Sequence, residues 1–161
     1  MIGTKFYKDN YDLDAYSQAA EWCNSNNAMI EDKGEYYEVV AIPEPSLAEV
    51  KASKLAELKA IRDTQEVADI QVNGRLFDYD DKARERINAA IVALDVMGGT
   101  IMWTLADNTD TEVSANDLRY VIAMVAQRSN VLHVKYRELK ERVENATTKE
   151  QVEAISWAEE Q

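Results

Sequence analysis

The feature that most constrains this chain is a row of residues spaced alternately four and three positions apart near its C-terminal end. Such a 4-3 spacing predicts one long helix that lies along another helix with slight left-handed supercoiling. The row consists of Leu118, Ile122, Val125, Ser129, Leu132, Tyr136, Leu139 and Val143. Only Ser129 interrupts its apolar and aromatic character. The partner is either the helix predicted to begin at Leu47 or the same helix in a second copy of the chain.

The segment before this row predicts a short hairpin followed by a helix. Asn73-Gly74 lies between apolar residues, and this pair favours a tight turn because both positions tolerate positive φ. Asp80 or Asp81 can cap the helix that follows, and Gly98-Gly99 ends it.

A second hairpin is predicted for Thr100 to Val113, with a polar turn from Asp107 to Asp110. Ser114 and Asp117 then have the spacing of a capping box. The long helix is therefore expected to begin directly after this hairpin.

The first part of the chain predicts a small mixed unit. Its elements are a short strand from Lys5 to Lys8, a helix from Leu13 to about Asn24, and two strands over Ala28 to Glu31 and Glu35 to Ile42. We expect these elements to form a compact strand-helix-hairpin unit.

Pro43-Glu44-Pro45 separates this unit from the rest, because each proline removes a backbone donor and restricts the residue before it. The predicted domains are residues 1–43, a small acidic α+β unit, and residues 46–161, a helical domain. The second domain starts with a helix from Leu47 to about Ala68. The expected fold class is α+β but mainly α, with two short β-hairpins and one long heptad-patterned helix in the second domain.

The charge of the chain limits the partners that it can take. Its net charge is −12, whereas affinity for nucleic acid comes largely from Lys and Arg. No apolar run is long enough to span a membrane, and the first residues do not resemble a signal peptide. We expect neither a nucleic acid nor a membrane as partner. Cys23 is the single cysteine and gives no sign of an oxidising compartment.

No pattern in the sequence indicates catalysis, a cofactor or a metal site. Ser114 and Ser129 lack a Gly-x-Ser-x-Gly context, and there is no glycine-rich phosphate loop. His133, the only histidine, has no neighbouring ligand at metal-site spacing. The clusters Asp78/Asp80/Asp81 and Asp107/Asp110 lack the alternation of an EF-hand loop and suit helix caps and turns better. The protein is expected not to be an enzyme.

Binding of other proteins is the function that remains. Candidate partner-binding residues are two adjacent tyrosines on a predicted strand and three polar residues at the tip of the second hairpin: Tyr36, Tyr37, Asp107, Asn108 and Asp110. Adjacent residues on a strand face opposite ways, so one tyrosine should remain available as an anchor if the other packs inward.

Several short motifs in one order carry a family resemblance over Lys51 to Trp157. They are Lys54-Leu55-Ala56-Glu57-Leu58-Lys59 with Arg62-Asp63, Val72-Asn73-Gly74 with Phe77, Arg84-Glu85-Arg86-Ile87-Asn88, Trp103-Thr104-Leu105-Ala106-Asp107-Asn108, Arg128 before Leu132-His133, and Tyr136-Arg137-Glu138-Leu139-Lys140. The segment resembles an uncharacterised domain family found in tail proteins of bacteriophages and prophages, often encoded beside tail fibre genes. The family often has a serine before the arginine of the third of these motifs, and this chain has Ala83 there.

The resemblance implies a bacteriophage tail-associated protein that binds tail fibre or adjoining tail components, as an assembly factor or a minor structural subunit. It implies a location in the virion tail or in the host cytoplasm during assembly. Self-association through the long helix is a further expectation from the 4-3 row. The alternative is an acidic phage-encoded inhibitor of a host defence or regulatory protein, which the negative charge permits and a clustered stripe of carboxylates would favour.

The lack of a metal-ligand pattern predicts that Zn²⁺, Mg²⁺ and Ca²⁺ leave the thermal stability of the protein unchanged. A ligand that binds only the native state stabilises it by about 2.7 kcal/mol at a hundred times its dissociation constant. Differential scanning fluorimetry with each ion, and with EDTA as control, measures this. A metal-dependent rise in melting temperature would mean that the acidic clusters were misread.

Overall fold

The computed structural model describes residues 1–158 and divides the chain into two compact units, Met1–Ser46 and Leu47–Gln161. These are called the N-terminal unit and the C-terminal unit below. The expected class is confirmed: the fold is α+β and mainly α, with five helices and small antiparallel sheets among the described residues. The segment Pro43-Glu44-Pro45 lies outside any helix or strand, at the end of the N-terminal unit.

The N-terminal unit is a three-stranded antiparallel sheet with one helix. Its elements are β1 (Lys5–Tyr7), α1 (Leu13–Ser25), β2 (Ala28–Asp32) and β3 (Tyr36–Ala41), and the strand order is β1-β3-β2. The helix begins where the Asp12 carboxylate accepts the backbone N–H of the second helical residue at 2.8 Å, which satisfies a donor that has no partner within the helix.

The core of this unit lies between α1 and one face of the sheet. Phe6 and Val39 point from the sheet to that side, and Ala19 and Cys23 meet them from α1. The sequence spacing of Leu13, Tyr16, Ala20 and Cys23, three and four positions apart, predicts one buried helical face. This prediction was only partly right, because Leu13 is 69% exposed. A spacing of three and four drifts around a helix of 3.6 residues per turn, and this drift carries Leu13 to the side of the buried stripe.

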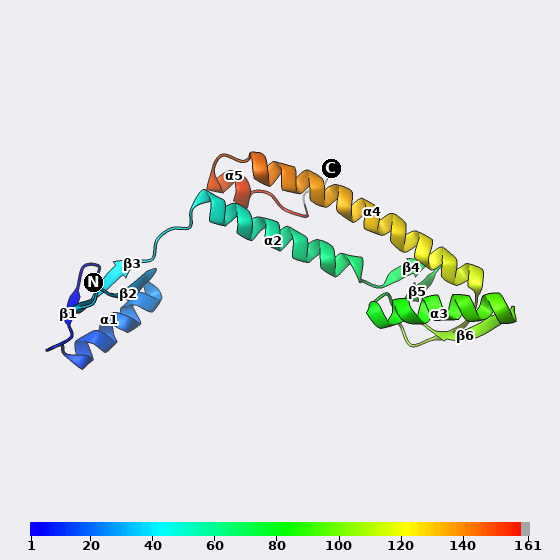
Figure 1. Cartoon of the computed structure of the whole chain (residues 1–161), viewed down its shortest axis with the longest axis horizontal. Helices are drawn as coiled ribbons and strands as arrows, with labels where there is room; N and C mark the ends of the chain where they lie inside the picture. Colours follow the sequence, from blue (N-terminus) through cyan, green and yellow to red (C-terminus); the bar gives the residue numbers. More distant parts are fainter. Residues whose placement is uncertain (159–161) are drawn as a thin grey trace. The chain divides into compact units, whose positions relative to one another are not determined.

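The C-terminal unit combines three long helices, two hairpins and one short helix (Figure 1). Its elements are α2 (Leu47–Glu66), β4 (Ile70–Val72), β5 (Arg75–Phe77), α3 (Asp81–Met97), β6 (Thr100–Thr104), β7 (Asp110–Ser114), α4 (Ala115–Asn145) and α5 (Lys149–Glu153). One half of α4 packs against α2, and the other packs against α3, β4 and β7. The short α5 folds back onto α2 and α4.

Local sequence signals account for the ends of these elements. Asn73 and Gly74 have φ values of 50° and 77° and join β4 to β5, as the Asn-Gly pair predicted. Of the two candidate caps for α3 the structure uses Asp80, whose Oδ1 accepts the N–H of Ala83 at 2.7 Å. Gly98, at φ 72°, ends the helix.

The predicted capping box at the start of α4 is present. Asp117 Oδ2 accepts the backbone N–H of Ser114 at 2.8 Å and its hydroxyl at 2.6 Å, and the N–H of Asp117 donates to Ser114 Oγ at 3.2 Å. The two hydrogen bonds that the carboxylate accepts lower the pKa of Asp117, and the one from the Ser114 hydroxyl contributes most.

The 4-3 row of α4 is buried or half-buried along its whole length and serves two separate clusters. Its first half, with Leu118 and Val125, packs among side chains of α3 and both hairpins, including Ile87 and Trp103. Its second half packs with α2, α5 and the segment after α5 around the fully buried Leu58. The predicted packing of the row against α2 therefore holds for its second half only. Self-association through α4 stays a prediction.

Replacing Leu132 by Ala should destabilise the protein by about 2 to 5 kcal/mol, because a buried leucine leaves a cavity among neighbours that relax only in part. Leu132 is 8% exposed in the second cluster, whereas its neighbour Val131 is 59% exposed. Val131→Ala is therefore the matched control, with an expected change of about 0.5 kcal/mol or less. Urea unfolding of both variants measures the difference, and equal midpoints would contradict the packing described.

Candidate functional site

The two candidate tyrosines point to opposite faces of the N-terminal sheet. The ring of Tyr37 joins the core side, with its centroid 6.0 Å from that of Tyr11 and 5.5 Å from that of Tyr16. Tyr36 faces the other way, where its ring centroid lies 5.4 Å from that of Tyr7. Of the pair, Tyr36 is therefore the residue that could act as an anchor.

Tyr36 belongs to a face of the sheet that is opposite α1, called the outer sheet face here. Its residues are Lys5, Tyr7, Met29, Glu31, Tyr36, Glu38 and Val40. Tyr7 and Met29 are more than 40% exposed, at 54% and 43%. The register places a charged row of Lys5, Glu38 and Glu31 between the pair Tyr7-Tyr36 and the pair Val40-Met29. Tyrosine is enriched in protein interfaces, so the tyrosine pair is the part of this face that resembles a protein-binding surface.

Charges on the outer sheet face are held by local partners. Lys5 Nζ lies 4.5 Å from the centroid of the Tyr36 ring and 3.4 Å from the Tyr36 hydroxyl. The hydrogen bond to that hydroxyl is the main reason that the pKa of Lys5 is raised. Lys33 forms an ion pair with Glu31 at 2.7 Å, so the negative charge of this face is partly compensated.

The three candidate residues of the second hairpin are exposed and build its turn. Asp107 Oδ1 accepts the hydroxyl and the backbone N–H of Thr109, at 2.6 and 3.0 Å, and these bonds lower the pKa of Asp107. Asp110 Oδ1 accepts the hydroxyl of Thr104 at 2.7 Å, and Asn108 has a φ of 62°. Turn formation explains all three residues, and a role in partner binding stays a prediction.

Arg128 holds a junction that the sequence did not reveal. Its guanidinium donates to three backbone carbonyl groups, that of Glu66 at the end of α2 at 2.9 Å and those of Ala68 and Asp69 just after the helix at 2.8 and 3.2 Å. It also lies 5.8 Å from the centroid of the Tyr79 ring. Carbonyl groups at a helix C-terminus lack partners within the helix, so Arg128 supplies donors where α2 stops and α4 continues.

The same junction explains the polar interruption of the 4-3 row. The hydroxyl of Ser129 donates to Glu66 Oε1 at 3.0 Å, and His133 Nε2 lies 3.2 Å from the same oxygen. Ser129 lies between the part of α4 in the first cluster and the part in the second. An apolar residue at this position would remove the hydrogen bond from the hydroxyl to the Glu66 carboxylate. The signals in the sequence were the interruption itself and the place of Arg128 in a family motif.

An open hollow of about 310 Å³ adjoins Arg128 on α4. Its lining is mostly apolar and comes from α4 and β4: Ile70, Met124, Gln127, Arg128, Val131 and Leu132. Nothing else in the described residues distinguishes it as a binding site.

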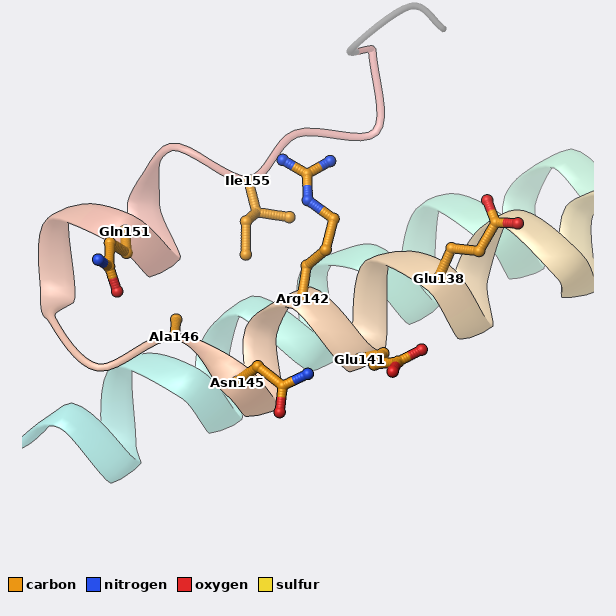
Figure 2. A pocket seen from close by; sticks show the side chains of 7 residues that line it. All are labelled: Glu138, Glu141, Arg142, Asn145, Ala146, Gln151 and Ile155. Carbon is orange, nitrogen blue, oxygen red and sulfur yellow. The ribbon is translucent and has the colours of Figure 1, made fainter.

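A larger groove, of about 600 Å³, lies where α4 ends and α5 turns back (Figure 2). Its lining residues are Glu138, Glu141, Arg142, Asn145, Ala146, Gln151 and Ile155. Figure 2 shows the first four on α4, with Gln151 and Ile155 on the returning segment that forms the other wall. None of the partner-binding residues predicted from the sequence lies in this groove.

Two further features bear on the class of site. Within residues 1–158, no group of three or more His, Cys, Asp or Glu side chains is placed to hold a metal ion. No helix in the described part of the chain is both long and apolar enough to cross a bilayer.

Comparison with known proteins gives a match to a family of domains. Residues 49–156 match the model of a family described as a domain of unknown function (DUF4376), which covers more than half of the chain. The matched segment lies in the C-terminal unit and includes both hairpins, Arg128 and the groove of Figure 2. No curated protein and no solved structure matches the chain.

Replacing Arg128 by Ala should destabilise the protein by about 2 kcal/mol, because three hydrogen bonds from a charged donor to backbone carbonyl groups are lost, one of them partly buried. Arg137→Ala is the matched control, since Arg137 is an exposed residue of the same helix. Thermal unfolding followed by circular dichroism measures both. Similar melting temperatures for the two variants would show that Arg128 does not stabilise the end of α2.

Proposed function

This chain belongs to the DUF4376 family of domains of unknown function, and we propose that it is a bacteriophage tail-associated protein that binds tail fibre or adjoining tail components without catalysing a reaction. The tail setting rests on the resemblance of its motifs to domains of phage tail proteins. The location that follows is the virion tail, or the host cytoplasm during assembly.

The outer sheet face is the observation that carries the binding role. It places two exposed or half-exposed tyrosines, Tyr7 and Tyr36, side by side, next to a charged row that contains Glu38. Tyrosine is enriched among the residues that dominate binding energy in protein interfaces, because a large ring is ordered at low entropic cost. The 4-3 row of α4, in contrast, is already used for packing within the chain.

Two ion pairs of the N-terminal unit favour this proposal over an inhibitor that imitates nucleic acid. Such an inhibitor needs a stripe of uncompensated negative charge. In the N-terminal unit, Glu31 and Asp32 each pair with a lysine, at 2.7 and 2.8 Å. The lysines of the protein itself therefore partly neutralise these two carboxylates.

Assembly factor and minor virion subunit are two forms of the same proposal. Mass spectrometry of purified particles separates them, because a subunit stays in the mature particle and an assembly factor does not.

Replacing Tyr36 by Ser should weaken binding to the neighbouring tail fibre protein by about tenfold, which corresponds to about 1.4 kcal/mol and is typical of an interface anchor. Tyr120→Ser is the matched control, since Tyr120 is 48% exposed on α4 in the other unit. Surface plasmon resonance of the purified proteins, at low and physiological salt, measures both affinities. Equal affinities for the two variants and the wild type would remove the outer sheet face from the interaction.

A further inference from the structure

The groove of Figure 2 has a negative rim. Glu138 and Glu141 are exposed and lie three positions apart on α4, so their side chains are neighbours on one side of the helix. Neither forms an ion pair with any residue from 1 to 158. With two carboxylates and the one guanidinium of Arg142, the lining is net negative.

The end of α4 adds to this negative potential. The last carbonyl groups of a helix carry a partial negative charge, which favours cations nearby. The chain already uses this effect on the side of α2, where Lys51 Nζ donates to the backbone carbonyl of Glu144 at 2.8 Å. On the groove side the last turn carries Arg142, so the negative potential that is left for a ligand comes mainly from Glu138 and Glu141.

The base of the groove is apolar. Ala146 and Ile155 are buried, at 9% and 4% exposure, and belong to the cluster around Leu58. A surface of this kind suits the methylene stem of lysine or arginine, which buries its apolar part while the charged end stays near water or a carboxylate. The volume of about 600 Å³ lies within the range of ligand sites in proteins.

We propose that this groove binds a basic peptide segment of a partner protein, with the stem of one lysine or arginine over Ala146 and Ile155 and its charged end between Glu138 and Glu141. A basic segment fits because its positive charge complements the net negative lining of the groove. A second copy of the chain, with its net charge of −12, is a poorer match, because like net charges repel. The site gives the C-terminal unit a binding role of its own, independent of the phage tail setting and of the outer sheet face.

Fluorescence anisotropy with the full-length chain tests the proposal. The probe is a labelled peptide in which arginine and alanine alternate, and a peptide with glutamine in place of arginine is its control. The double variant Glu138→Gln/Glu141→Gln should bind the arginine peptide at least about fivefold more weakly than the wild type, the scale of two exposed charge pairs. Gln keeps the size and most of the hydrogen-bonding capacity of Glu, so the melting temperature should be unchanged.

The matched control is Glu21→Gln/Glu85→Gln, which makes the same change in net charge on exposed residues of α1 and α3. This variant should bind as the wild type does. Equal weakening in both double variants would mean that the peptide responds only to the overall charge, and this would overturn the site. No binding by the wild type, or equal binding of the glutamine peptide, would overturn it as well. None of these results depends on a tail protein.

Discussion

The structure of the C-terminal unit depends on one constraint, which is that a single helix packs two different clusters. The first half of the 4-3 row in α4 is buried with α3 and both hairpins, and the second half with α2 and α5. Fully buried residues lie at both ends of the row, Leu118 and Val143. At the change from one cluster to the other, Arg128 and Ser129 bind the end of α2. The polar interruption of the row is therefore a structural joint.

This arrangement determines what is left for recognition. Since the main apolar row is used internally, the proposed binding roles fall to surfaces that the packing leaves open. One is the outer sheet face of the N-terminal unit, where Tyr36 is turned away from the core that holds Tyr37. Another is the groove at the end of α4, with its carboxylates Glu138 and Glu141. The first offers aromatic anchors and the second offers negative charge, so the two suit different partners.

Most of the fold was predictable because its signals are local. Asn73-Gly74 specifies its turn through backbone preferences of two residues, and Ser114 with Asp117 specifies the start of α4 through contacts three positions apart. The partners of the 4-3 row were left open, because a spacing defines a face without naming what covers it. The structural role of Arg128, which the sequence showed only as part of a family motif, was missed for a related reason: its acceptor in Glu66 lies 62 positions away. The groove likewise forms only when α5 folds back onto α4.

Hydrogen exchange along α4 in the native protein, read by mass spectrometry, shows whether this helix joins the two clusters as one element. A helix that both clusters hold as one rigid element should show slow exchange from Leu118 to Val143 without a break, since amides of this kind open only with the cluster that covers them. Protection should continue through Ser129, where Glu66 and Arg128 join the two halves. Fast exchange around Ser129, with each half of α4 opening separately, would contradict the account.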